Sequence, residues 1–181
     1  MRPYRETVLA EVQSVLQRVD DRDARAFVRE LARARRRSIY ITGVGRSGLV
    51  VHAFGQRLMH LGFDVHLAHE ITAPAIRRSD LLVACSGTGR TLIPLYMARK
   101  ARTIGARVVS LTAMPGSPLA KLSHLAIHLP APLERGSGTR QPARSLFEQA
   151  LFLYLDSVVL TAMHELRIPA GRLRRRHANL E

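Results

Sequence analysis

The spacing of apolar residues changes character after residue 37. Before that point apolar residues recur three and four positions apart, which predicts helices over residues 6–19 and, beyond Asp20, up to residue 34. After it, short apolar runs predict five strands, at 38–42, 65–68, 81–85, 108–111 and 125–129. Strands that alternate with helices are typical of a parallel sheet covered on both faces. We therefore predict an α/β fold, a single doubly wound five-stranded parallel sheet flanked by helices.

The most apolar segment follows a loop at residues 129–142, which is rich in proline and glycine and is placed to move over a site. Ser145 is the predicted N-cap of this helix, with Glu148 at the capping-box position, and the helix should continue to Leu166. Glu148 and Asp156 interrupt it, which argues against a membrane span. Because the helix is apolar on nearly every side, we expect it to contact a second subunit in a homo-oligomer, a dimer or a tetramer.

Length and composition predict one domain. The chain has 181 residues, 46% of them apolar, which suits a single buried core. We divide it into N-terminal helices (1–37), the sheet with its long helix (38–166) and a basic C-terminal tail (167–181). One cysteine excludes an internal disulfide, and no cleavable signal pattern is present at the start. We expect a soluble, cytoplasmic protein that does not enter a membrane.

The net charge of +14 is carried almost entirely by arginine, since Lys100 and Lys121 are the only lysines among 28 basic residues. Nucleic-acid binding, attraction of small anionic substrates and coding bias without a role all fit this excess. Apart from the runs 35–37 and 174–176, the basic residues are scattered, and no aromatic residues lie between them as a stacking platform would require. The pattern favours solvated surface over a nucleic-acid partner.

Two glycine-rich turns carry the candidate chemistry. Each follows a predicted buried strand and precedes a helix, so backbone N–H groups and the positive end of a helix would converge on one anion. The glycines Gly45, Gly87 and Gly89 let the backbone approach an anion closely. The predicted phosphate ligands are the hydroxyls of Ser47, Ser86, Thr88 and Thr91, with Arg46 as a charged partner. For Ser86 and Thr91, capping of the next helix is the alternative role.

The first turn also fits the dinucleotide fingerprint, because Gly43, Gly45 and Gly48 have its spacing and Glu70 follows the second strand. The hydroxyl-rich second turn and the lack of a following substrate domain argue against a nicotinamide site. We therefore expect no cofactor.

Several segments together resemble the sugar isomerase (SIS) domain family and, more narrowly, the 6-phospho-3-hexuloisomerases. They are residues 43–50, 57–63, 86–91, 117–122, 146–149 and 176–181. The resemblance implies a flavodoxin-like fold and interconversion of D-arabino-3-hexulose 6-phosphate and fructose 6-phosphate, a step of formaldehyde fixation by the ribulose monophosphate route. It also implies cofactor-free, oligomeric enzymes with sites near subunit boundaries. Arg90 departs from the family pattern, which usually has a glutamate there, and residues 141–145 differ from the commoner small, methionine-containing run. A non-catalytic sugar-phosphate regulator stays open as an alternative, although no helix-turn-helix of the usual length is appended.

Moving a carbonyl between neighbouring carbons of a ketose phosphate requires a base and a proton shuttle. Glu148 is the predicted base, because it is an isolated acid in the first turn of an apolar helix; capping of that helix is its alternative role. His177 is the predicted proton shuttle, because its C-terminal tail could reach a neighbouring site; the alternative is that it is a solvated histidine without a catalytic role. His60 is the second candidate for the shuttle. The other histidines show no metal-ligand pattern, so we predict no metal.

Overall fold

The computed structural model describes residues 2–134 and 136–179, so Leu180 and Glu181 of the resemblance lie outside the described residues. Its centre is a five-stranded, all-parallel sheet in the order β2-β1-β3-β4-β5. The strands are β1 (Ser38–Thr42), β2 (Asp64–Leu67), β3 (Leu81–Cys85), β4 (Arg107–Thr112) and β5 (Leu125–His128). The predicted fold class is therefore confirmed, and every predicted strand is present, with ends that differ by at most one residue.

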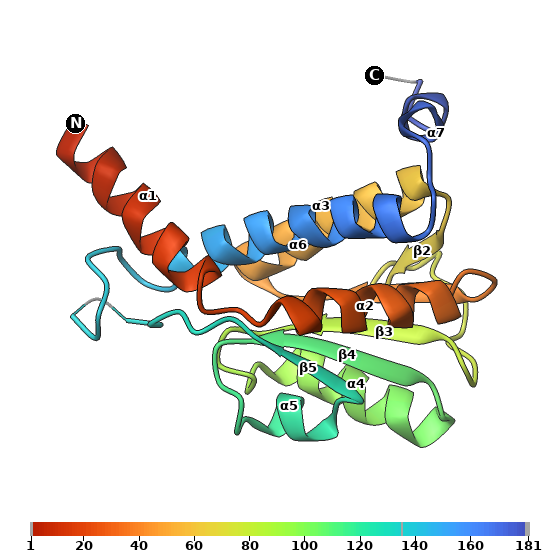
Figure 1. Cartoon of the computed structure of the whole chain (residues 1–181). Helices are drawn as coiled ribbons and strands as arrows, with labels where there is room; N and C mark the ends of the chain where they lie inside the picture. The colour runs from red at the N-terminus through yellow and green to blue at the C-terminus, as the bar shows by residue number, and fades with distance from the viewer. Residues whose placement is uncertain (1, 135, 180–181) are drawn as a thin grey trace.

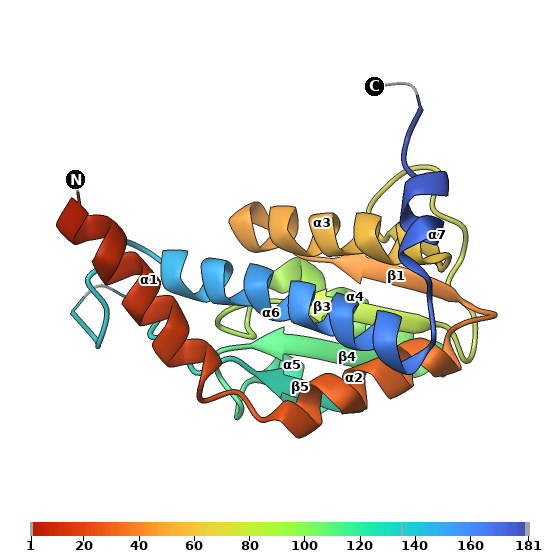
Figure 2. The ribbon, with the colours of Figure 1, turned by 45° about the horizontal axis from the view of Figure 1, so that its top comes forward.

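Helices cover both faces of the sheet (Figures 1 and 2). One face carries α1 (Arg2–Leu16), α2 (Asp21–Arg33), α3 (Gly45–Leu61) and α6 (Ser145–Glu165), and the other carries α4 (Leu92–Ile104) and α5 (Pro118–Leu122). The short helix α7 (Ala170–Arg175) lies beside the end of α3, within the segment predicted as a tail. Helix α6 contacts α1, α2 and α3, so it is the central helix of its layer.

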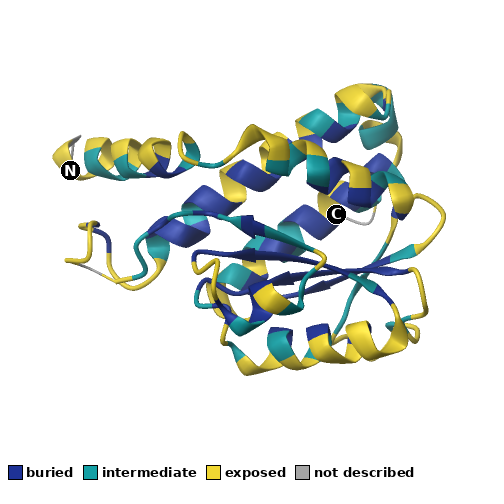
Figure 3. Ribbon diagram, turned by 60° about the horizontal axis from the view of Figure 1, so that its bottom comes forward, coloured by how far each residue is buried: buried dark blue, intermediate teal, exposed yellow. Residues whose placement is uncertain are grey.

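Two apolar cores lie on the two faces because side chains alternate along each strand. Ile39 and Ile41 of β1 face the larger core under α1, α2, α3 and α6, where Phe27 and Phe54 pack with ring centroids 5.7 Å apart. Tyr40 faces the smaller core under α4 and α5. Buried residues follow the strands and the helix faces turned towards them, whereas the outer faces are exposed (Figure 3).

Helix α6 is long and apolar enough to span a bilayer by length and composition alone, but half of its most apolar window is buried inside the protein. It is the core helix of its layer, and its burial explains that composition. The predicted cap of α6 is wrong: the helix begins at Ser145, and Arg144 occupies the N-cap position without a side-chain cap. The predicted end at Leu166 is within one residue of the observed end.

The loop before α6 has no helix or strand within residues 129–134 and 136–142, as predicted, and its second half is held to α1 by one carboxylate. Glu11 accepts hydrogen bonds from the Thr139 hydroxyl (2.7 Å), the Arg140 backbone N–H (2.8 Å) and the Gln141 amide (3.0 Å). Burial would raise the pKa of Glu11, but these bonds and the charge of Arg140 lower it overall. The loop is thus positioned at the start of α6, beside the candidate site.

Candidate active site

A cavity of about 190 Å³ lies where the carboxyl ends of β1 and β3 meet the first turn of α6. In open parallel sheets ligands bind at this end of the strands, where the chain direction of the crossovers reverses. Both predicted glycine-rich turns and the predicted base contribute to it. Its lining consists of Val44, Gly45, Arg46, Ser47, Cys85, Ser86, Gly87, Thr88, Thr91, Arg144 and Glu148.

The turn between β1 and α3 is built by close backbone packing. A Cβ atom on Gly48 would lie 2.8 Å from the carbonyl oxygen of Gly43, so only glycine fits there, and Gly45 has φ +62°. Helix α3 begins at Gly45, and its N-cap residue Val44 makes no side-chain cap. The first N–H groups of α3 therefore have no capping side chain and border the cavity. The dinucleotide-like spacing of these glycines follows from this packing.

The second turn also requires glycine. A Cβ atom on Gly89, which has φ +61°, would lie 2.0 Å from the Ser117 hydroxyl oxygen. The Ser86 and Thr91 hydroxyl oxygens lie 2.8 Å apart, and the Thr88 hydroxyl accepts from the N–H of Arg90 at 3.2 Å. Thr91 is the N-cap residue of α4 but makes no side-chain cap, so the capping role does not describe its hydroxyl. Three hydroxyls are thus gathered on one wall of the cavity.

The carboxylate of Glu148 also lines the cavity and is buried, with its side chain 11% exposed. It accepts a hydrogen bond from the guanidinium of Arg46, whose side chain is 65% exposed. This pair joins the first turn of α6 to the first turn of α3, two segments about a hundred residues apart. The predicted reciprocal capping box is not formed. Glu148 instead presents its carboxylate to the cavity.

Besides Val44, two further residues line the cavity without having been predicted as ligands. Arg144, at the N-cap of α6, adds a second guanidinium beside Arg46. The only sequence signal was that residues 141–145 depart from the family pattern. Cys85 also lines the cavity and is fully buried; burial, with the charge of Glu148, raises the pKa of its thiol, which is typical of a packing residue and not of a nucleophile. Arg90 is exposed and does not line the cavity.

The two predicted histidines lie together, but far from this cavity within one chain. His60 is in the last turn of α3, fifteen residues after Gly45, roughly 22 Å along the helix. His177 stacks on it, with ring centroids 5.1 Å apart. Glu148 and the two glycine-rich turns are therefore brought together, whereas a role for His177 requires the site of a second copy and stays a prediction.

No group of three or more metal-ligating side chains occurs within residues 2–134 and 136–179. Glu70, the acid of the dinucleotide alternative, lines a different cavity beside Tyr40 and Tyr96. Glu70 therefore does not line the cavity that the two glycine-rich turns form with Glu148.

Comparison with known proteins identifies the family. The SIS domain model matches residues 30–155. The 3-hexulose-6-phosphate isomerase of Mycobacterium gastri is 38% identical over 174 residues, covering 94% of this chain and 86% of that protein, and the Bacillus subtilis protein of the same name is 39% identical, covering 79% and 80%. A Methanococcus jannaschii crystal structure, from which a 3-hexulose-6-phosphate isomerase function was inferred, superposes with a TM-score of 0.86 at 28% identity, covering 99% of both chains. The chain therefore belongs to the SIS domain family and is an isomerase.

Proposed function

We propose that this isomerase interconverts 3-hexulose 6-phosphate and fructose 6-phosphate without a cofactor, as a soluble, cytoplasmic enzyme. The observation that carries the proposal is the meeting of Glu148 with both glycine-rich turns in one cavity. The names of relatives that are 38% and 39% identical support this pair of substrates. The activity would place the enzyme in the ribulose monophosphate route.

The phosphate group is held by the turns. Helix N-termini with free N–H groups bind phosphate dianions, and neutral hydroxyls add directed hydrogen bonds without placing more charge near the base. In this assignment Ser47, Ser86, Thr88 and Thr91 contact the phosphate. Arg46 and Arg144 stand at the border between the phosphate and the sugar, where a guanidinium binds an anionic oxygen in a bidentate manner.

Glu148 is the base in the proposed mechanism. It takes the proton from carbon two of 3-hexulose 6-phosphate, which gives an enediol, and returns a proton to carbon three, while a hydroxyl proton moves between the two oxygens. The contact between Arg46 and Glu148 places a positive charge next to the carboxylate. When substrate binds, Arg46 can also stabilise negative charge that develops on the enediol oxygen.

In this mechanism His177 of a neighbouring copy in a homo-oligomer transfers the hydroxyl proton from one substrate oxygen to the other. A groove of about 300 Å³ beside the cavity is lined by Arg46, Leu49, Glu148 and Phe152, among others. Leu49 is 70% and Phe152 42% exposed, and such apolar side chains between α3 and α6 suit a subunit contact. A strictly monomeric protein in light scattering at micromolar concentration would contradict both assignments.

Deuterium exchange tests the activity directly. Fructose 6-phosphate incubated with the enzyme in D2O should acquire carbon-bound deuterium at carbon three, seen by NMR, because Glu148 exchanges its proton with solvent between the two transfers. The Glu148→Gln variant is the matched control and should give no exchange. A protein that binds fructose 6-phosphate but leaves it unlabelled would be a sugar-phosphate sensor, the alternative function.

A further inference from the structure

We propose that a nucleoside polyphosphate binds across two adjoining cavities, one at the amino edge of the sheet, opposite the active site, and one beside α4. One cavity is basic and takes the phosphates, and the other is apolar and takes the base. Tyr40 and Pro74 line both, so the two cavities meet at these residues. This proposal goes beyond the isomerase activity and does not depend on it.

The basic cavity has a volume of about 470 Å³ and lies at the starts of β1, β2 and β3. Arg35, Arg36 and Arg37, in the turn before β1, and Arg77, in the loop before β3, supply four guanidiniums. Within the part of the chain that the structure describes, none of the four forms an ion pair. Guanidiniums bind phosphate oxygens in a bidentate manner, so four of them suit a chain of phosphates.

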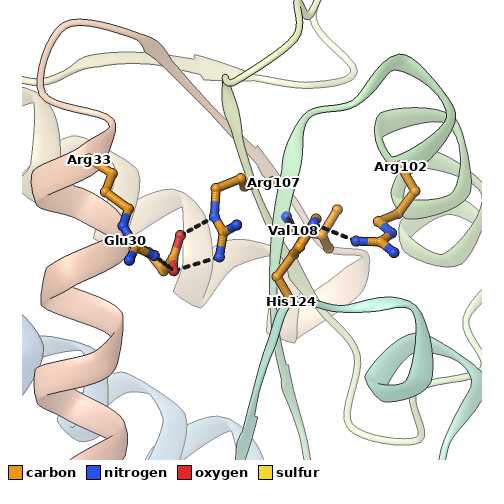
Figure 4. Close-up of polar contacts among 6 residues, drawn as sticks. All are labelled: Glu30, Arg33, Arg102, Arg107, Val108 and His124. Carbon is orange, nitrogen blue, oxygen red and sulfur yellow. Dashed lines mark hydrogen bonds and ion pairs between the residues drawn. The ribbon is translucent and has the colours of Figure 1, made fainter.

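Other arginines at the same edge are already engaged, which sets these four apart (Figure 4). Arg33 and Arg107 both bind Glu30, and the guanidinium of Arg102 contacts the His124 ring. The edge therefore contains arginines that hold the fold together and, separately, arginines that face an open cavity. Among the described residues, the arginines of the second group are exposed and form no ion pair.

The two acids in the basic cavity are engaged by groups other than its four arginine guanidiniums. Asp80 accepts hydrogen bonds from the backbone N–H groups of Arg77 (2.7 Å) and Ser38 (3.3 Å). Asp64 accepts from the Ser38 hydroxyl at 2.6 Å, and its other neighbour is His66. Four arginines against two aspartates leave the cavity net positive. Its charge thus favours an anionic ligand.

The apolar cavity explains why the ligand should be a nucleotide rather than a free phosphate. It has a volume of about 180 Å³ between α4 and the loop that follows β2, with walls from Ile76, Leu82 and Met97. Tyr96 lines it and is 58% exposed, which leaves its ring available to stack on a base. Glu70 and Lys100 provide polar groups at its border for hydrogen bonds to a base edge.

The same geometry argues against a longer nucleic acid. Single-stranded nucleic acid binds to a row of aromatic side chains along a basic groove. Here one exposed aromatic ring, that of Tyr96, stands beside one base-sized cavity. The arrangement fits a single nucleotide, with its phosphates towards Arg35, Arg36 and Arg37.

Isothermal titration calorimetry with ATP, at about 0.1 M salt where non-specific surface attraction is partly screened, tests this site. We expect saturable binding, at least tenfold tighter than that of adenosine or inorganic triphosphate alone. The Arg36→Ala/Arg37→Ala variant and the Tyr96→Ala variant should each weaken ATP binding about tenfold or more. The Arg174→Ala/Arg175→Ala variant, which removes the same charge from the other arginine run, should bind ATP as the wild type does.

Four results would overturn the proposal: no saturable binding, displacement of ATP by fructose 6-phosphate, equal weakening in the Arg174→Ala/Arg175→Ala control, or tighter binding of a single-stranded oligonucleotide than of ATP. Should the double variant lose its fold, the single exposed substitution Arg77→Ala carries the test with the same expected direction. Turnover by the ATP-site variants is measured alongside, so a failed isomerase assay and a failed ATP site are separate results.

Discussion

Two buried glutamates, each in contact with arginine, have opposite surroundings. Glu30 is enclosed: Arg107 donates to both of its oxygens, at 2.5 and 2.8 Å, and Arg33 adds a third hydrogen bond at 2.6 Å (Figure 4). Glu148 is equally buried but contacts one guanidinium and borders an open cavity. The first carboxylate has its hydrogen bonds satisfied by the protein, whereas the second retains capacity for a substrate.

The difference separates stability from function. The Glu30 contacts join α2 to the start of β4, two elements far apart in sequence, and satisfy a buried charge. Helix α6 positions Glu148 at a cavity that is also lined by the two glycine-rich turns. A buried carboxylate with incomplete partners is costly for the fold, which is expected where chemistry requires it. Arginine contact alone therefore does not distinguish the two roles; the open cavity does.

The largest effect should come from Glu148→Gln. Removing a general base typically lowers a rate by a factor of about 10² to 10⁴, so we expect kcat to fall about a thousandfold. Because glutamine keeps the shape of the side chain, Tm should change little. Steady-state kinetics and thermal unfolding measure both. Wild-type turnover in this variant would show that Glu148 is not the base. The contrast between a structural Glu30 and a catalytic Glu148 would then be wrong.

Glu30→Ala should have the converse outcome. The variant loses the charge-assisted hydrogen bonds from Arg107 and Arg33, while these arginines can reach solvent, so we expect a loss of about 2 kcal/mol in the free energy of unfolding. Urea denaturation measures this loss, and kcat of the folded fraction should stay at the wild-type value. Asp21→Ala, an exposed acid at the start of the same helix, is the control and should change stability far less. A stable, inactive Glu30 variant would reverse the two assignments.

Removal of two side-chain hydroxyls that are proposed to bind the phosphate should have a smaller effect on turnover than loss of the base. Each hydrogen bond contributes about 1 kcal/mol, so Ser47→Ala/Thr88→Ala should raise KM about tenfold or more while kcat changes less. Thr103→Ala is the matched control, because its hydroxyl donates to the Arg99 carbonyl within its own helix. An unchanged KM for fructose 6-phosphate in the double variant would show that the substrate phosphate does not bind at these two hydroxyls. The cavity beside Glu148 would then not be the phosphate site.

The sequence predicts those features of the fold and the site that depend on interactions between residues close together in the chain. The limits of β1 and β3 match their apolar runs because both strands are buried along nearly their whole length. Strand β2 is an edge strand with no fully buried residue, so its hydrophobic pattern is weaker and the predicted limits are shifted by one residue. The two turns were predictable because glycine spacing reports local backbone geometry.

Local sequence patterns do not predict contacts between segments that are far apart in the chain. The predicted cap at Ser145 fails because Arg144 is the N-cap residue of α6, and the Glu148 carboxylate contacts Arg46 instead of the helix backbone. The pairing of Glu30 with Arg107 gives no sequence signal, since 77 positions separate them. The arrangement of the arginines at the amino edge likewise depends on the fold. The roles of the site residues, including His60 and His177, stay predictions.

The smallest effect expected is a change in the acid dependence of stability, and it tests the enclosed glutamate without disrupting it. Burial would raise the pKa of Glu30, but the hydrogen bonds and charges of Arg107 and Arg33 outweigh it and lower the pKa below its ordinary value of 4.5. A lowered pKa in the folded state means that the stabilisation is complete above pH 4.5 and is lost as the pH falls through the folded-state value. In urea titrations between pH 6 and pH 3, the wild-type free energy of unfolding should therefore fall more steeply than that of Glu30→Gln, which has no proton to gain. Because a protonated carboxyl still accepts hydrogen bonds, the difference in slope should amount to less than the full loss in Glu30→Ala. Parallel curves for the two proteins would mean that the Arg107 contact does not favour the charged form of Glu30, and the contrast with Glu148 would then rest on the open cavity alone.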